Sequence, residues 1–142
     1  MRRSLIALIA FLWVAGCGEL GQSPTDPGEI DPIDQSATFA RVRAEILSPK
    51  CTTIGCHDAI GQSEGLVLEP DVAYGNLVNH SSSELPQLDR VEPGDPEASY
   101  MYWKITGRQG IIGDRMPLFS TPLSETEINL VRNWIRRGAP ND

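Results

Sequence analysis

The sequence predicts an all-α domain of about four short helices joined by long loops, behind a separate N-terminal segment. Apolar residues recur at helical spacing in four places, and typical cap residues bound those places. The intervening segments hold most of the 13 glycines and 11 prolines of the 142-residue chain, which indicates loops. No pair of alternating apolar runs indicates paired strands. The folded domain is expected over residues 37–142.

The N-terminus has the pattern of an export signal. Arg2 and Arg3 precede an apolar run of 11 residues, Leu5 to Ala15, which suits a signal-peptide core and is too short to span a bilayer. Small residues then precede Cys17, as in a bacterial lipobox, where cleavage leaves a lipid-bearing cysteine. Residues 1–16 are therefore expected to be a signal peptide, with Cys17 as the lipidation site. An ordinary cleaved signal is the alternative.

Residues 17–36 are expected to be a tether. Between residues 19 and 35 there are three prolines, five acidic residues and no basic residue, so little apolar surface is available to offset the entropy of ordering. The expected location is the periplasmic face of the cell envelope. In the lipoproteins that this pattern resembles, an aspartate directly after the lipidated cysteine favours retention in the inner membrane. Here Gly18 has that position, so the outer membrane is expected.

The charge balance argues against nucleic acid as a partner. Removing residues 1–16 takes away two of the 12 basic residues and none of the 19 acidic ones, which leaves ten against 19, or about minus nine. Such a surface repels phosphate backbones and offers no basic stripe.

The first expected helix follows the tether. Ser36 is the expected N-cap, and Pro49 is expected to end the helix at Ser48. Four apolar residues at helical spacing form the expected buried stripe: Phe39, Val42, Ile46 and Leu47. The segment that begins at Cys51 would follow this helix directly along the chain.

Two helices are expected in the middle of the chain. A short helix is predicted over residues 71–78, with Pro70 near its first turn. A second is predicted from Pro96, capped by Asp95 and ended by Gly107. Its inward-facing residues are expected to be Tyr100, Trp103 and either Met101 or Ile105.

The last expected helix has the clearest boundaries. Ser124 and Glu127 form a capping box, and Gly138 and Pro140 follow the final turn. Its expected buried stripe is Ile128, Val131, Trp134 and Ile135.

The segment from Cys51 to His57, CTTIGCH, contains the side chains best suited to bind a metal or a cofactor. Two cysteines five positions apart in an oxidising compartment are expected to be bridged, bound to a metal, or bonded to a cofactor. A short disulfide is geometrically possible. A zinc site would need His80 as its fourth ligand, without the paired spacing of structural zinc modules. A covalent haem site normally has the spacing CxxCH, whereas here four residues separate the cysteines.

With the other motifs in view, residues 37 to 140 resemble a group of small bacterial mono-haem c-type cytochrome domains found in exported proteins, here in the widened CxxxxCH variant. The matching motifs follow one another in family order: Cys51, Cys56 and His57; PGDPEASY from Pro93 to Tyr100; Met116-Pro117; and WIRRGA from Trp134 to Ala139. The resemblance implies a cytochrome c-like fold whose long loops wrap around one haem.

The same resemblance implies the roles of individual residues. Cys51 and Cys56 would attach haem c covalently, His57 would be the proximal iron ligand and Met116 the distal one. His80 is the rival distal ligand, whereas Met101 is expected only to pack. The widened spacing requires residues 52–55 to bulge, and Gly55 can take the positive φ that a bulge needs.

The implied function is electron transfer, with redox proteins as partners and a lipid anchor as the membrane attachment. An enzyme is not expected, because two protein ligands on the iron would exclude substrate. The alternative is a non-redox binding or structural lipoprotein on the same scaffold, with Cys51 and Cys56 joined as a disulfide.

Overall fold

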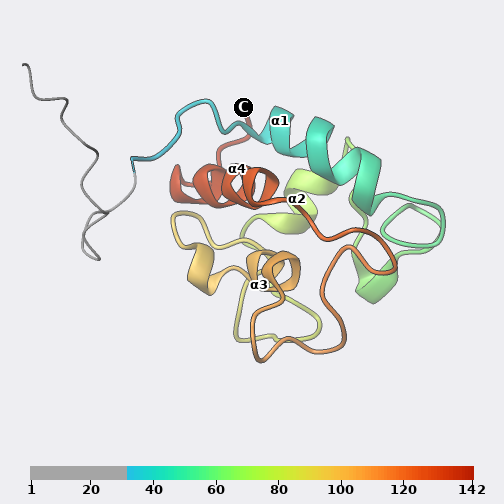
Figure 1. Cartoon of the computed structure of the whole chain (residues 1–142). Coiled ribbons are helices and arrows are strands. Elements are labelled where there is room, and N and C mark those ends of the chain that lie inside the picture. The colour runs from blue at the N-terminus through green and yellow to red at the C-terminus, as the bar shows by residue number, and fades with distance from the viewer. Residues whose placement is uncertain (1–31) are drawn as a thin grey trace, which may run out of the picture. The chain divides into compact units, whose positions relative to one another are not determined.

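A computed structural model describes residues 32–142. The expected signal peptide (1–16), the expected lipidation site Cys17 and most of the expected tether (17–36) lie outside the described residues. Residues Pro32–Asp142 form a compact unit. Its helices, shown in Figure 1, are α1 (Phe39–Val42), the π-helix η1 (Arg43–Cys51), the 3-10 helix η2 (Ser63–Gly65), α2 (Ala73–Leu77), the 3-10 helix η3 (Pro96–Ala98), α3 (Tyr100–Thr106) and α4 (Glu125–Arg136).

The all-α prediction is confirmed for the part of the chain that the structure describes. Extended backbone pairs there only as isolated bridges, such as the one between Val78 and Val91. Long loops connect the helices (Figure 1). None of the helices within residues 32–142 is long and apolar enough to cross a membrane.

The first helix differs from its prediction at both ends. Thr38, not Ser36, is the N-cap, and its hydroxyl accepts a hydrogen bond from the backbone N–H of Arg41 at 3.2 Å. The helix does not end before Pro49, because α1 continues as η1 to Cys51. Pro49 has no N–H to donate in either kind of helix, so one bond is missing there; the five-residue bonding of a π-helix resumes beyond it, where the Thr52 N–H donates to the Leu47 carbonyl at 3.1 Å. The helix therefore carries Cys51 on its own last turn.

The helix predicted from Pro96 to Thr106 is divided at Ser99. Asp95 caps η3 through bonds from the backbone N–H groups of Glu97 and Ala98, and Gly107 ends α3 with φ 70°, as predicted. Between these ends, Ser99 is extended and fully buried. Its hydroxyl donates to the Asp95 carbonyl at 2.8 Å and accepts from the backbone N–H of Glu92, which replaces the bonds of a continuous helix.

Trp103 does not face inwards as predicted. Its indole N–H donates to the Glu97 carbonyl at 2.7 Å, and the guanidinium of Arg108 lies 4.3 Å from the ring centroid. This stacking on a partly exposed surface is a favourable cation–π arrangement. Lys104 is the residue of α3 that is buried instead. Ring stacking and one hydrogen bond thus keep the indole outside the core.

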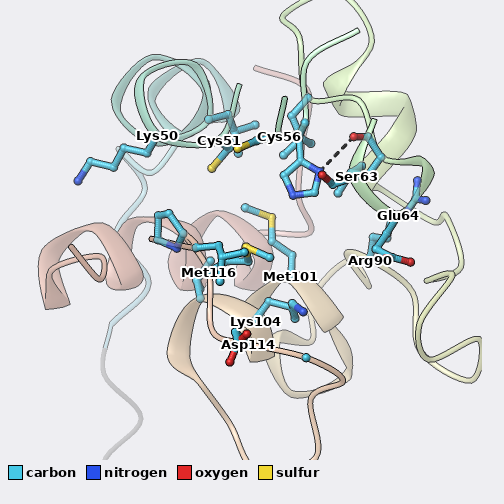
Figure 2. Close-up of a pocket in the computed structure, with 18 of the residues that line it drawn as sticks. Lys50, Cys51, Cys56, Ser63, Glu64, Arg90, Met101, Lys104, Asp114 and Met116 are labelled. Carbon is cyan, nitrogen blue, oxygen red and sulfur yellow. Dashed lines mark hydrogen bonds between the residues drawn. The ribbon is translucent and has the colours of Figure 1, made fainter. Parts of the chain in front are cut away.

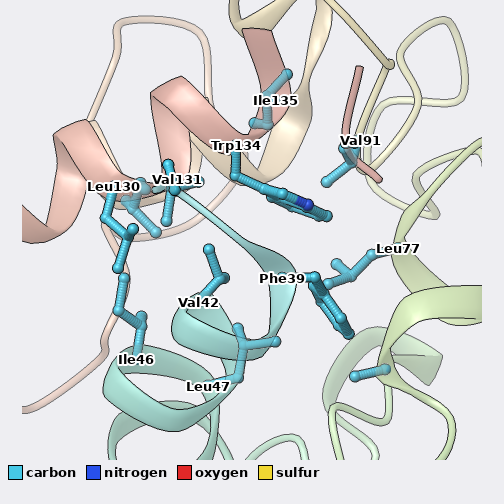
Figure 3. Packing of buried hydrophobic residues seen from close by; sticks show 14 of the residues in the cluster. Phe39, Val42, Ile46, Leu47, Leu77, Val91, Leu130, Val131, Trp134 and Ile135 are labelled. Carbon is cyan, nitrogen blue, oxygen red and sulfur yellow. The ribbon is translucent and has the colours of Figure 1, made fainter. Parts of the chain in front are cut away.

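The core lies mainly between α1, η1 and α4 (Figure 3). Phe39 packs against Trp134, with ring centroids 5.2 Å apart. The predicted stripe of α4 is confirmed at Val131, Trp134 and Ile135, whereas Ile128 is only partly buried. The other fully buried apolar side chains of the two helices are Val42, Ile46 and Leu47.

Asp142, at the C-terminus, accepts hydrogen bonds from the first residues of α1. The carboxylate of Asp142 accepts from the backbone N–H of Phe39 at 3.0 Å, and the Asp142 carbonyl accepts from that of Ala40 at 2.8 Å. Arg137 donates both to the Ala37 carbonyl and to Asp142. The end of the chain therefore satisfies the free N–H groups of α1, and it lies beside α1 in Figure 1.

Candidate functional site

A cavity of about 710 Å³ opens between the end of η1, the loop that follows it, α3 and the loop after α3. This volume lies in the range of ligand pockets, roughly 300–1,000 Å³. Most of its wall is apolar; the aliphatic residues include Leu47, Leu66, Leu68, Leu77 and Ile105. All four residues assigned to one site from the sequence line this cavity: Cys51, Cys56, His57 and Met116.

The widened loop between the cysteines is a compact turn. The backbone N–H of Cys56 donates to the Thr53 carbonyl at 2.9 Å, and that of His57 donates to the Cys51 carbonyl at 3.2 Å. Gly55 has φ 85°, as the sequence predicted, and this conformation is costly for any residue with a side chain. Ile54, at the tip, is 91% exposed. The tip of the four-residue loop is thus exposed, whereas Thr53 and both cysteines line the cavity.

Asp58, which the sequence did not single out, holds this turn from the other side. One oxygen of its buried carboxylate accepts from the backbone N–H of Gly61 at 2.7 Å and from that of Gly55 at 3.2 Å. The two glycines lie so close that a Cβ on Gly61 would be 2.3 Å from the carbonyl carbon of Gly55. An aspartate in a glycine-rich loop is a known turn signal and could have indicated this contact.

His57 has a fixed orientation. Its Nδ1 lies 3.1 Å from the Leu66 carbonyl, and because a carbonyl only accepts, Nδ1 carries the proton. In the neutral imidazole, Nε2 would then be the nitrogen able to bind a metal ion. The Leu68 N–H donates to the His57 carbonyl at 2.8 Å, so backbone and side chain are both held by the segment after the turn.

Both cysteines are free thiols and partly buried. Burial raises the pKa of Cys51 from its usual 9.0 to about 11, with a smaller contribution from the nearby Cys56 thiol. Cys51 is therefore protonated at neutral pH, and the thiol form is a weak nucleophile. The Thr53 hydroxyl donates to the sulfur of Cys56 at 3.3 Å. In Figure 2 both cysteine side chains enter the cavity from the η1 side.

Two methionines line the cavity together with the cysteines. Met116, predicted as a ligand, and Met101, predicted only to pack, both line the wall, and in Figure 2 the side chain of Met101 points towards the cysteines. Met101 packs against the hydrophobic core, as predicted, and also lines the cavity. Met101 and Ile105 are four positions apart on α3 and both line the cavity, so helical spacing was the signal that linked them.

His80 lies elsewhere. It is exposed, its Nδ1 is 3.1 Å from the Ser81 carbonyl, and it is not among the residues that line the cavity. This position gives no support to His80 as a distal ligand or as a fourth zinc ligand. Within residues 32–142, no three His, Cys, Asp or Glu side chains converge as the ligands of a metal ion would.

Two cations line the far end of the cavity. The ammonium group of Lys104 lies 3.2 Å from the Glu84 carboxylate and donates to the Ile112 carbonyl at 2.8 Å. Arg90 donates to the Asn76 carbonyl at 2.9 Å, and burial lowers its pKa. The charge of Lys104 is thus balanced by a carboxylate, whereas the partner of Arg90 is a neutral carbonyl.

The cavity therefore combines thiols able to form covalent bonds with an imidazole nitrogen and thioether sulfurs able to bind a transition metal. No family model matches the chain, and comparisons with curated proteins and with solved structures gave no match.

Proposed function

We propose that residues 37–142 form a cytochrome c-like electron-transfer domain that carries one haem, attached covalently through Cys51 and Cys56. The observation that supports this most directly is that both cysteines, His57 and Met116 line one cavity. These residues come from separate elements, and their order along the chain is the order of the c-type motifs. The long loops on both sides of the cavity are also what a domain built around a large cofactor requires.

The donor set fits such a cofactor. The sulfurs of Cys51 and Cys56 would form the thioether bonds, and Nε2 of His57 would bind the iron while the Leu66 carbonyl fixes the imidazole tautomer. Met116 would supply the second protein ligand to the iron. When bound, the haem supplies reversible one-electron exchange at its iron. The apolar wall would exclude water, and two protein ligands would leave no position for a substrate, which supports an electron carrier rather than an enzyme.

The proposed setting is an exported domain tethered by lipid at Cys17 to the periplasmic face of the cell envelope, with the outer membrane favoured. The excess of acidic residues, 19 against 12 basic ones in the full chain, favours redox partners that present a basic face. The same charge disfavours nucleic acid.

The competing proposal is a non-redox binding or structural lipoprotein in which Cys51 and Cys56 form a disulfide. The observation that favours it is local: the Thr53–Cys56 turn folds back so that both thiols lie on the same wall. A bridge this short would stabilise the fold less than one that closes a long loop. It would leave His57 and Met116 with no shared role.

The test is expression of the full chain in cells with a haem-attachment system that accepts widened motifs. We expect coloured protein whose mass exceeds that of the processed chain by one haem, and the haem should stay attached after denaturation. The variant Cys51→Ser/Cys56→Ser is the matched control and should lose the covalent haem. A colourless product two hydrogen atoms lighter than its reduced form would contradict the proposal and support the disulfide.

A further inference from the structure

The cavity holds one more sulfur ligand than a six-coordinate iron needs. His57 would supply one protein ligand to the iron, and both Met101 and Met116 line the same cavity. A thioether in an apolar wall is ordinarily a gap filler. Here, however, both methionines line the cavity together with the two cysteines, so each is placed to bind what the cavity holds.

Met101 is held by a regular element. It lies in the first turn of α3, between the buried Tyr100 and the buried Lys104 and Ile105. Its backbone N–H donates to the Arg90 carbonyl at 2.9 Å, which joins the start of α3 to the neighbouring extended segment. The direction of the side chain is therefore set by the helix, independently of the loop that carries Met116.

Met116 lies in the loop after α3 and is joined to that helix by a backbone hydrogen bond. Its backbone N–H donates to the Lys104 carbonyl at 2.9 Å, and the side chain of Arg115 donates to the Ile105 carbonyl at 2.8 Å. Residues 106–122 include no buried residue, and Phe119 is 98% exposed. A segment with so few buried contacts opens at a lower free-energy cost than a packed helix.

We infer that Met101 is a second thioether ligand, able to bind the iron in place of Met116 whenever the loop of residues 107–122 moves away. The inference rests on the proposed function and adds a residue to its site. Both side chains end in the same thioether, so the exchange preserves the type of ligand and hence the kind of iron site. The structural basis is that α3 positions both: Met101 directly, and Met116 through the carbonyl of Lys104.

The test compares haem-loaded wild type with Met116→Leu, Met101→Leu and the double variant. Leucine has nearly the volume of methionine, so the fold should be preserved, and far-ultraviolet circular dichroism checks this. The readouts are the methionine–iron absorption band of the oxidised protein, the proton NMR signal of a ligated methionine methyl group, and the affinity for added imidazole. His80→Ala is the matched control and should change none of them.

We expect Met116→Leu to keep the signals of a ligated methionine. The double variant should lose them and bind imidazole roughly tenfold more tightly or better, because no thioether competes for the iron. Met101→Leu should also keep the signals, because Met116 remains; if Met101→Leu alone removed them, the two methionines would not exchange and the inference would be overturned.

The inference is overturned if Met116→Leu alone loses the methionine signals and matches the imidazole affinity of the double variant. Wild-type protein that takes up no haem would overturn the proposed function, and the inference with it. The two failures are therefore distinguishable, since the first occurs only in protein that carries haem.

Discussion

The helix layer and the cavity of this domain are built from different kinds of side chain. In the layer between α1 and α4, Val42, Val131 and Trp134 are fully buried and contact one another through apolar surface alone (Figure 3). In the cavity, Cys51, His57 and Met116 are only partly buried and carry groups able to form covalent or metal bonds. The difference is the one expected if the first region stabilises the fold and the second, as proposed, holds a cofactor.

The two regions share a boundary. Leu47 and Leu77 belong to the buried core and also line the cavity. A ligand that fills the cavity would therefore add contacts to the core and stabilise it, because any molecule that binds only the native state does so. The following predictions test how far the regions are separate, from the largest expected effect to the smallest.

Trp134→Ala should have the largest effect, because it removes the largest side chain of the helix layer. We expect the free energy of unfolding to fall by about 3–5 kcal/mol, the usual cost of deleting a buried aromatic ring. The measurement is urea unfolding followed by circular dichroism.

Trp103→Ala is the matched control for that substitution. Its indole lies outside the core against Arg108, so its loss should cost about 1 kcal/mol or less, the scale of an exposed cation–π contact. Equal losses for the two tryptophans would contradict the distinction between the helix layer and the rest of the domain.

Asp58→Ala should act on the cavity side with a smaller effect. It leaves the backbone N–H groups of Gly55 and Gly61 without their shared acceptor, at a cost of about 1–3 kcal/mol. We expect faster alkylation of Cys56 and a lower yield of attached haem, with the helix layer intact. Asp58→Asn keeps an acceptor oxygen and should resemble wild type more closely. An alkylation rate in Asp58→Ala equal to that of wild type would show that the carboxylate does not hold the turn.

The last prediction concerns the stability of the haem-free protein at alkaline pH. No effect on stability is expected at neutral pH. The pKa of Cys51 is about 11 in the folded chain against a usual 9.0, mainly because of burial. Above pH 9.0 the unfolded chain loses this proton first, so the folded state binds more protons. Stability of the haem-free protein should therefore fall as the pH rises from 9.0 towards about 11.

The measurement is the alkylation rate of Cys51 in a haem-free Cys56→Ser variant, with the urea-denatured chain as control. In the folded variant the rate should rise at a higher pH than in the denatured chain, since the thiolate is the reactive form. Coincident pH profiles would mean that Cys51 is not buried in the haem-free protein.

Much of the local structure could be predicted because its signals lie within a few residues. The capping box of Ser124 and Glu127, the Asp95 cap and the helix end at Gly107 depend only on neighbouring residues, and all three are confirmed. The apolar spacing in the first and last helices also identified most of the helix layer. For the site, the motif order selected Cys51, Cys56, His57 and Met116, and all four line one cavity.

What the sequence by itself determined, then, are the helix caps, the buried stripes and the identity of the reactive residues. Only the tertiary structure decided that the first helix passes Pro49 as a π-helix, that Trp103 faces outwards and that Met101 faces the cysteines. Each of these depends on contacts with segments distant along the chain or on a choice between nearly equal local conformations. Local propensities are worth only fractions of a kcal/mol per residue, so packing between distant segments decides such positions.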